Sequence, residues 1–95
     1  MNVSATTQTV AGALTFETVP DLYQNSSKWF EGTGELILDL AQVERTDSAG
    51  LALLIEWLRR AQAANRKLRF ANIPLQVQTL IRINGLQDAL LSSSS

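Results

Sequence analysis

The strongest pattern along the chain is an apolar stripe of helical period in its middle third. The members of the stripe recur three and four residues apart, at Leu51, Leu54, Ile55, Leu58 and Ala61. Residues at these spacings share one face of an α-helix. The stripe therefore predicts a helix over residues 48–65 that packs its apolar face on the core and ends at Asn65, a residue suited to a C-terminal cap.

Two apolar segments of another kind flank this helix. Residues 35–40 form a short, almost continuous apolar run, which is typical of a strand covered on both faces. Residues 67–73 alternate between apolar and polar side chains and predict another strand. Strand, helix and strand at this spacing indicate a βαβ unit with parallel strands and a right-handed crossover. Residues 41–47 are polar apart from Val43, and we interpret them as the connection into the helix.

The N-terminal third predicts three shorter elements. Residues 7–11 and 13–17 alternate weakly around Gly12, which indicates two short strands joined by a tight turn. Pro20 then marks the start of a helix that reaches Phe30.

The C-terminal third predicts one more helix. Pro74 is suited to the first turn of a helix over residues 75–84, and a short apolar segment follows it. The run of serines at 92–95 indicates a disordered tail. Together the segments predict an α/β fold, a single domain over residues 1–91, with a mixed, mostly parallel sheet of about four strands and about three helices.

Composition and charge narrow the function. The chain has neither cysteine nor histidine, which removes thiolate metal sites, cysteine nucleophiles and Ser-His triads. We therefore expect no enzymatic activity, no metal and no cofactor. A net charge of −1, without a one-sided basic cluster, does not indicate nucleic acid as a partner. The basic residues at 59–60 and 66–69 are interpreted as a solvated helix end. No apolar run is long enough for a bilayer and no secretory signal is present, so we expect a cytoplasmic domain without membrane insertion.

A six-residue turn, Thr46-Asp47-Ser48-Ala49-Gly50-Leu51, leads into the long helix. Asp47 or Ser48 is suited to cap the helix, since its side-chain oxygen can accept a free backbone N–H. Gly50 allows the helix to pack closely on the sheet. A hydroxyl at a helix N-terminus also lies where free amides and the helix dipole favour an anion.

This turn resembles the signature turn of STAS domains, the fold shared by anti-sigma-factor antagonists and sulfate-transporter tails. The run Leu36–Leu40, then Val43, then Asp47–Leu54 most closely resembles the MlaB branch of that family, and the likeness covers about residues 36–91. The N-terminal third is similar only in the order of its elements, since Phe16-Glu17-Thr18-Val19 stands where many members have a glycine-containing turn.

The resemblance implies a non-catalytic regulatory adaptor. Its partner would be the MlaF-like ATPase subunit of an ABC transporter for phospholipid trafficking that maintains outer-membrane lipid asymmetry, which would hold the chain at the inner membrane from the cytoplasmic side. In that branch the hydroxyl residue matching Ser48 lies at the ATPase contact. In the antagonists a kinase phosphorylates the matching serine. Gly50-Leu51-Ala52 replaces the Gly-Leu-Gly usual in the antagonists, which favours the adaptor. An anti-sigma-factor antagonist switched by phosphorylation of Ser48 is the alternative.

A second face of the long helix, away from the apolar stripe, carries Leu53, Trp57 and Arg60. A partly exposed Trp and Leu beside an Arg would anchor a partner, and packing of Trp57 under a neighbouring helix is the alternative. A hydrolase with paired carboxylates at Asp39 and Asp47 is a further hypothesis, disfavoured because so short a chain has little surface for a substrate cleft. The predicted partner-binding residues are Thr46, Asp47, Ser48, Ala49, Gly50, Leu53, Trp57 and Arg60.

Overall fold

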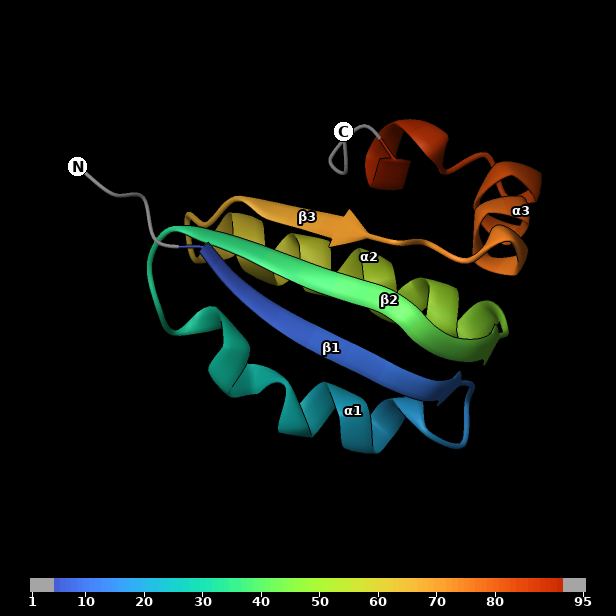
Figure 1. The fold of residues 1–95 in the computed structure, drawn as a ribbon, viewed down its shortest axis with the longest axis horizontal. Helices are drawn as coiled ribbons and strands as arrows, with labels where there is room; N and C mark the ends of the chain where they lie inside the picture. The colour runs from blue at the N-terminus through green and yellow to red at the C-terminus, as the bar shows by residue number, and fades with distance from the viewer. Residues whose placement is uncertain (1–4, 92–95) are drawn as a thin grey trace.

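Three parallel strands in the order β1-β2-β3 form the sheet of this α/β fold (Figure 1). The structure is a computed structural model that describes residues 5–91. The strands are β1 (Ala5–Leu14), β2 (Glu35–Thr46) and β3 (Leu68–Ala71). Both strand pairs are parallel, so the predicted βαβ unit is confirmed. Within the described part of the chain the sheet is fully parallel, with one strand fewer than expected.

A helix covers one face of the sheet (Figure 1). α2 crosses behind the strands in Figure 1, and the face of the sheet toward the viewer carries no helix of the described residues. The helical segments are α1 (Val19–Asn25), the 3₁₀ turn η1 (Ser27–Phe30), α2 (Ser48–Ala63), α3 (Leu75–Ile83) and the π-helical turn η2 (Gln87–Leu91). The helices predicted after Pro20, at 48–65 and at 75–84 are therefore confirmed, the first of them broken at Ser26. The predicted tail at 92–95 lies outside the described residues.

The predicted hairpin around Gly12 is wrong. β1 runs unbroken through this glycine, which adopts a φ of 84° within the strand. The register of β1 on β2 shifts between Thr9 and Ala11 and again between Gly12 and Leu14. Gly12 therefore permits a bulge in a long strand, a role that a glycine inside a strand pattern also fills.

The polar connection predicted at residues 41–47 is also wrong, because β2 continues to Thr46. In this half of the strand Val43 and Thr46 are buried, while Glu44 and Arg45 are exposed. The extension carries the end of β2 to the end of β1, with Leu14 opposite Thr46. The two carboxyl ends meet where α2 begins, and this edge of the sheet holds the predicted turn.

Arg66 has a structural role that the sequence interpretation of the basic cluster at residues 66–69 did not include. Its side chain is buried, and the guanidinium donates hydrogen bonds to the backbone oxygens of Trp29, Thr33 and Gly34 at 2.7, 3.2 and 3.0 Å. Arg66 therefore fixes the loop between η1 and β2. The interpretation of this arginine as part of a solvated helix end is wrong.

Candidate functional site

Asp47 is the residue that caps α2. Its carboxylate oxygen Oδ1 accepts hydrogen bonds from the backbone amides of Ala49 and Gly50, at 2.9 and 3.1 Å. The residue has extended backbone angles, as a helix N-cap requires. Of the two cap residues that the sequence allowed, the structure therefore selects Asp47 and leaves Ser48 as the first residue of the helix.

Asp47 also joins the ends of the two longest strands. Its second carboxylate oxygen accepts a hydrogen bond from the backbone amide of Phe16 at 3.1 Å, and its own amide donates to the backbone oxygen of Leu14 at 3.1 Å. One side chain thus fixes the start of α2 relative to β1. The turn is held rigidly by backbone contacts on both sides.

Gly50 allows α2 to pack directly on the end of β1. A methyl group in place of its hydrogen would overlap the backbone oxygen of Leu14 and come within 2.7 Å of the Leu14 Cβ and 2.8 Å of the Thr46 Cγ2. Such distances are far shorter than an ordinary carbon–carbon contact of about 3.5–4.0 Å. The close packing expected at this glycine is confirmed.

Ser48 is exposed on this rigid turn. Within residues 5–91 its hydroxyl group makes no hydrogen bond to another side chain or to the backbone. The amides of Ala49 and Gly50, which an anion at a helix N-terminus would use, already bind Asp47. The hydroxyl of Ser48 is thus open to a partner protein, while the anion site expected beside it is occupied by the carboxylate.

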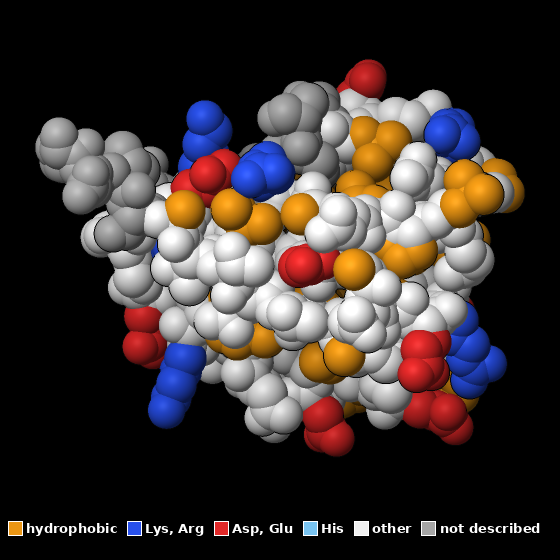
Figure 2. All heavy atoms as spheres, viewed as in Figure 1, with side chains coloured by type: hydrophobic (Ala, Val, Ile, Leu, Met, Phe, Trp, Pro, Cys, Tyr) orange, Lys and Arg blue, Asp and Glu red, His pale blue; other side chains and the backbone are white. Residues whose placement is uncertain are grey.

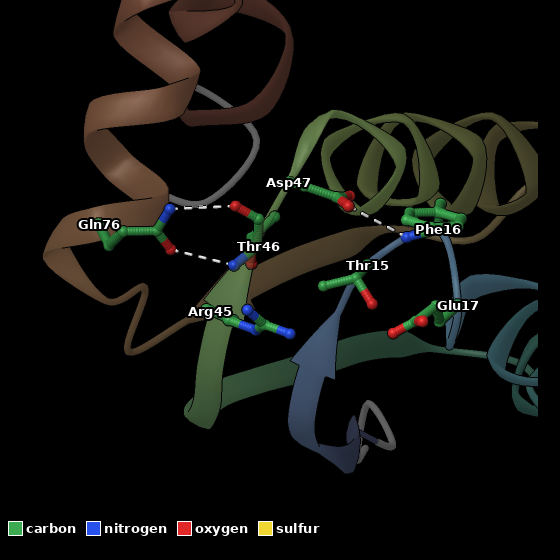
Figure 3. Close-up of a pocket in the computed structure, with 7 residues that line it drawn as sticks. All are labelled: Thr15, Phe16, Glu17, Arg45, Thr46, Asp47 and Gln76. Atoms are coloured by element: carbon green, nitrogen blue, oxygen red, sulfur yellow. Dashed lines mark hydrogen bonds between the residues drawn. The ribbon is translucent and has the colours of Figure 1, made fainter.

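A glutamine on α3 completes the frame of the site. The Gln76 side chain accepts a hydrogen bond from the Thr46 amide at 3.1 Å and donates one to the Thr46 backbone oxygen at 3.0 Å (Figure 3). This pair of bonds copies the pairing that a neighbouring strand would make. Gln76 therefore ties α3 to the last residue of β2, a contact that no sequence pattern indicated.

A depression of about 350 Å³ lies beside the turn. Figure 3 shows its lining side chains, which come from the turn after β1, the end of β2, the N-cap of α2, and α3: Thr15, Phe16, Glu17, Arg45, Thr46, Asp47 and Gln76. The Phe16 side chain is 71% exposed, which is unusual for so large an apolar group. We call Ser48 together with the exposed lining residues Phe16, Glu17, Arg45 and Gln76 the Ser48 surface. Sequence reasoning identified only Ser48 among them, and the departure at Phe16 from the glycine-containing turn of the family was the signal for a second.

The hypothesis that Leu53 and Trp57 form an exposed contact is wrong. Leu53 is 2% exposed and Trp57 is fully buried. The Trp57 indole Nε1 donates a hydrogen bond to the buried Ser26 hydroxyl at 2.8 Å, and its ring lies 5.4 Å from the Trp29 ring. Arg60 lies over the Tyr23 ring at 4.0 Å, so it too belongs to the contact between α2 and α1.

The two carboxylates Asp39 and Asp47 do not form a pair. Asp39 lies within β2 and Asp47 directly follows its last residue, and the eight residues of extended chain that separate them span about 26 Å. Asp39 accepts hydrogen bonds from the Ala41 amide and the Asn72 side chain instead. The expectation that these carboxylates approach each other is wrong. Within residues 5–91 no three or more Asp and Glu side chains are grouped as a metal ion would require.

The electrostatics of the site centre on Asp47. Partial burial would by itself raise the pKa of this carboxyl, but hydrogen bonds from the amides of Gly50, Phe16 and Ala49 and the positive charge of Arg45 outweigh it and hold the pKa below its ordinary value. The carboxylate is therefore ionised throughout the neutral range. Its charge holds the turn together and balances that of Arg45.

Replacing Asp47 by asparagine is expected to lower the free energy of unfolding by an amount that depends on pH, because the charged carboxylate stabilises the fold. A carboxyl whose pKa is lower in the folded than in the unfolded chain stabilises the fold above the unfolded value of about 3.9, and this contribution disappears as the pH falls through the folded pKa. The difference in unfolding free energy between wild type and variant, from urea titrations, should be largest near neutral pH and shrink below about pH 4. The pKa of Asp39 is also lowered, by the Ala41 amide and the Asn72 side chain. Asp39→Asn therefore serves as the comparison variant, because it removes a similar charged carboxylate that caps no helix. A difference for Asp47→Asn that stays constant with pH would contradict the cap role of the charged form.

Comparison with known proteins agrees with this architecture. A family model described as "Mlab, STAS domain" matches residues 1–92. A crystal structure of a sulfate transporter family protein from Wolinella succinogenes superimposes with a TM-score of 0.74 at 18% identity, covering 95% of this chain and 75% of the other. The anti-sigma factor antagonist SpoIIAA in its unphosphorylated form gives a TM-score of 0.69 at 19% identity, covering 94% and 79%. No curated protein sequence matches this chain.

The two kinds of comparison carry different weight. The solved structures are too distant in sequence to indicate more than a shared fold, and they come from two functional classes. The family model spans almost the whole chain and includes the turn capped by Asp47. No helix among residues 5–91 is both long and apolar enough to cross a membrane. This chain belongs to the STAS domain family and is of the MlaB-like type.

Proposed function

We propose that the chain is a regulatory adaptor that binds the ATPase subunit of an ABC transporter for phospholipids, and that it does so through the Ser48 surface. The adaptor performs no chemistry of its own. The partner binds and hydrolyses ATP, and the chain acts by stabilising one conformation of the partner. The partner then holds the chain at the cytoplasmic side of the inner membrane. The phospholipid transport that it regulates maintains the lipid asymmetry of the outer membrane.

The observation that carries the proposal is the exposed Ser48 on a turn that is otherwise locked. Asp47 fixes the turn to β1 and Gln76 fixes the end of β2 to α3, so the surface keeps its shape without a partner. A preformed surface lowers the ordering cost of binding. Membership of the MlaB-like group supports a transporter ATPase as the occupant.

The chemistry of the surface fits a protein partner. The exposed Phe16 ring offers the kind of aromatic anchor that contributes most to protein interfaces. Glu17 and Arg45 place one charge of each sign on the rim of the depression. A surface with an apolar centre and a mixed polar rim is typical of regulatory interfaces.

Co-purification tests the proposal directly. The tagged chain, expressed in its native host and isolated from gently solubilised membranes, should recover an ABC-type ATPase identified by mass spectrometry. Recovery of a soluble serine kinase or an anti-sigma factor instead would favour the phosphorylation-switched antagonist, for which the exposed Ser48 hydroxyl and the likeness to the SpoIIAA fold are the supporting observations.

The control for this experiment is a charged substitution at an exposed position far from the Ser48 surface. Gln62 is exposed in the last turn of α2, about 20 Å along the helix from Ser48. The Gln62→Glu variant adds one negative charge to the same helix and should recover the same partner in the same amount.

A further inference from the structure

β1 is an edge strand whose outer side is free. It pairs with β2 on one side, and within residues 5–91 no strand pairs with its other side (Figure 1). Helix α1 lies below β1 in Figure 1 and contacts α2. An edge of this kind presents a row of backbone N–H and C=O groups that can bind a further strand.

The first half of this edge, Ala5–Thr9, lacks the features by which proteins usually protect such a strand. The ten residues of β1, Ala5–Leu14, contain no charged residue and no proline. The opposite edge, β3, is only four residues long, contains Arg69 and directly follows Lys67. Charge and short length discourage pairing at β3, whereas at β1 only the bulges do so, and they lie beyond Thr9.

The two bulges restrict the usable edge to its first half. Residues Ala5–Thr9 pair with Glu35–Asp39 in continuous register, and the register shifts begin after Thr9. Beyond that point the Ala13 backbone oxygen already accepts a hydrogen bond from the Thr18 hydroxyl at 2.7 Å. The segment Ala5–Thr9 is therefore the part of β1 that is regular enough to accept a partner strand.

We propose that Ala5–Thr9 pairs with the same segment of a second copy of this chain, antiparallel and centred on Thr7. A two-fold axis at Thr7 places Thr7 opposite Thr7, Thr6 opposite Gln8 and Ala5 opposite Thr9. All these side chains are uncharged, so self-pairing brings no like charges together, and threonine pairs across strands are favourable. The two sheets then form one continuous sheet of six strands.

The face of the sheet next to this edge is compatible with such a dimer. Thr7 and Thr9 are opposite Ile37 and Asp39 in register, on the face without helices, and both threonines are exposed. Most charged side chains in the view of this face lie around its rim (Figure 2). The pairing segment itself carries no charged side chain into the contact.

The dimer leaves the Ser48 surface of each copy free. Ala5–Thr9 lies at the amino end of β1, and the Ser48 surface lies at its carboxyl end, about 23 Å along the strand from the centre of the segment at Thr7. A strand contact of five residues buries less than the roughly 1,200 Å² of a stable interface, so pairing is weak, with a dissociation constant of about 0.1–1 mM. Two weakly joined copies would bind a two-fold symmetric partner with increased avidity.

Charge exchange at Thr7 tests the proposal. Sedimentation velocity of the wild-type chain should show dimers that increase with concentration up to about 1 mM. Thr7→Lys and Thr7→Glu place like charges opposite each other and should each weaken association about fivefold or more. An equimolar mixture of the two variants should restore association, because opposite charges then meet.

The control variant is Thr7→Val, which keeps a branched side chain suited to a strand and should associate like wild type. Hydrogen exchange of the wild-type chain gives a second readout that needs no variant: amides in Ala5–Thr9 should become more protected as the concentration rises. A wild-type chain that stays monomeric up to about 1 mM, or charged variants that associate as well as wild type, would overturn the proposal.

Discussion

Replacing Gly50 by alanine should destabilise this fold by about 2 kcal/mol or more, although the substitution is in a helix. The added methyl group would overlap the Leu14 backbone oxygen and crowd the Thr46 side chain. A backbone oxygen in a paired strand cannot rotate away as a flexible side chain can. The first turn of α2 must therefore move off the end of β1, and the Asp47 cap moves with it.

The sign of the stability change in Gly50→Ala distinguishes close packing from helix propensity. In a helix free of such contacts, alanine is about 1 kcal/mol more favourable than glycine, so helix propensity alone predicts stabilisation. Urea unfolding of Gly50→Ala should show a lower midpoint than wild type with a similar slope. Gly32→Ala is the matched control, because its methyl group would meet only the Arg66 side chain, at 3.7 Å. A more stable Gly50→Ala variant would show that α2 does not approach β1 so closely.

The parts of the fold that the sequence predicted well are those with a strong local period. The stripe from Leu51 to Ala61 determined α2, and the apolar run at residues 35–40 determined the first half of β2. Gly12 was ambiguous because a glycine in an alternating segment is compatible with both a turn and a bulge. The decision depends on β2, whose twelve residues offer β1 a partner along its whole length, whereas an isolated hairpin is only marginally stable.

Trp57 shows why the second face of α2 was misassigned. A helical wheel separates one core-facing stripe from the rest, but α2 is covered on two sides, by the sheet and by the segment that contains Ser26 and Trp29. The Trp57 indole donates its buried hydrogen bond to a residue 31 positions away. No local pattern specifies such a contact, and a buried polar partner for the indole is visible only in three dimensions.

The sequence predicted the turn of the candidate site but not the residues from other segments that surround it. The stretch from Thr46 to Gly50 was recognisable because a cap, a hydroxyl and a glycine follow a buried strand in a set order. Phe16 and Gln76 join it from segments 30 residues away on either side, as single residues without a period. Their role depends on the carboxyl ends of β1 and β2 lying together, which required the full length of β2.

Ser48→Glu should weaken binding of the transporter ATPase by about 30-fold or more while leaving the fold stable. Ser48 is exposed and makes no hydrogen bond within residues 5–91, so the longer side chain meets no obstacle in the free chain. Surface substitutions of this kind usually change stability by about 0.5 kcal/mol or less. In the complex, a carboxylate left without a partner in a packed contact costs about 2–5 kcal/mol.

No free pair of backbone amides is left to bind the added carboxylate, and this makes the outcome decisive. The amides of Ala49 and Gly50 already bind the Asp47 carboxylate, so a second carboxylate at Ser48 gains no amide pair and meets a like charge beside it. Ser48→Ala removes the hydroxyl without adding charge and should reduce binding by about threefold at most. Titration calorimetry or surface plasmon resonance with the purified ATPase, beside Gln62→Glu, measures the difference. Equal affinity of Ser48→Glu and wild type would remove Ser48 from the interface, since no packed contact accepts an uncompensated charge without loss of affinity.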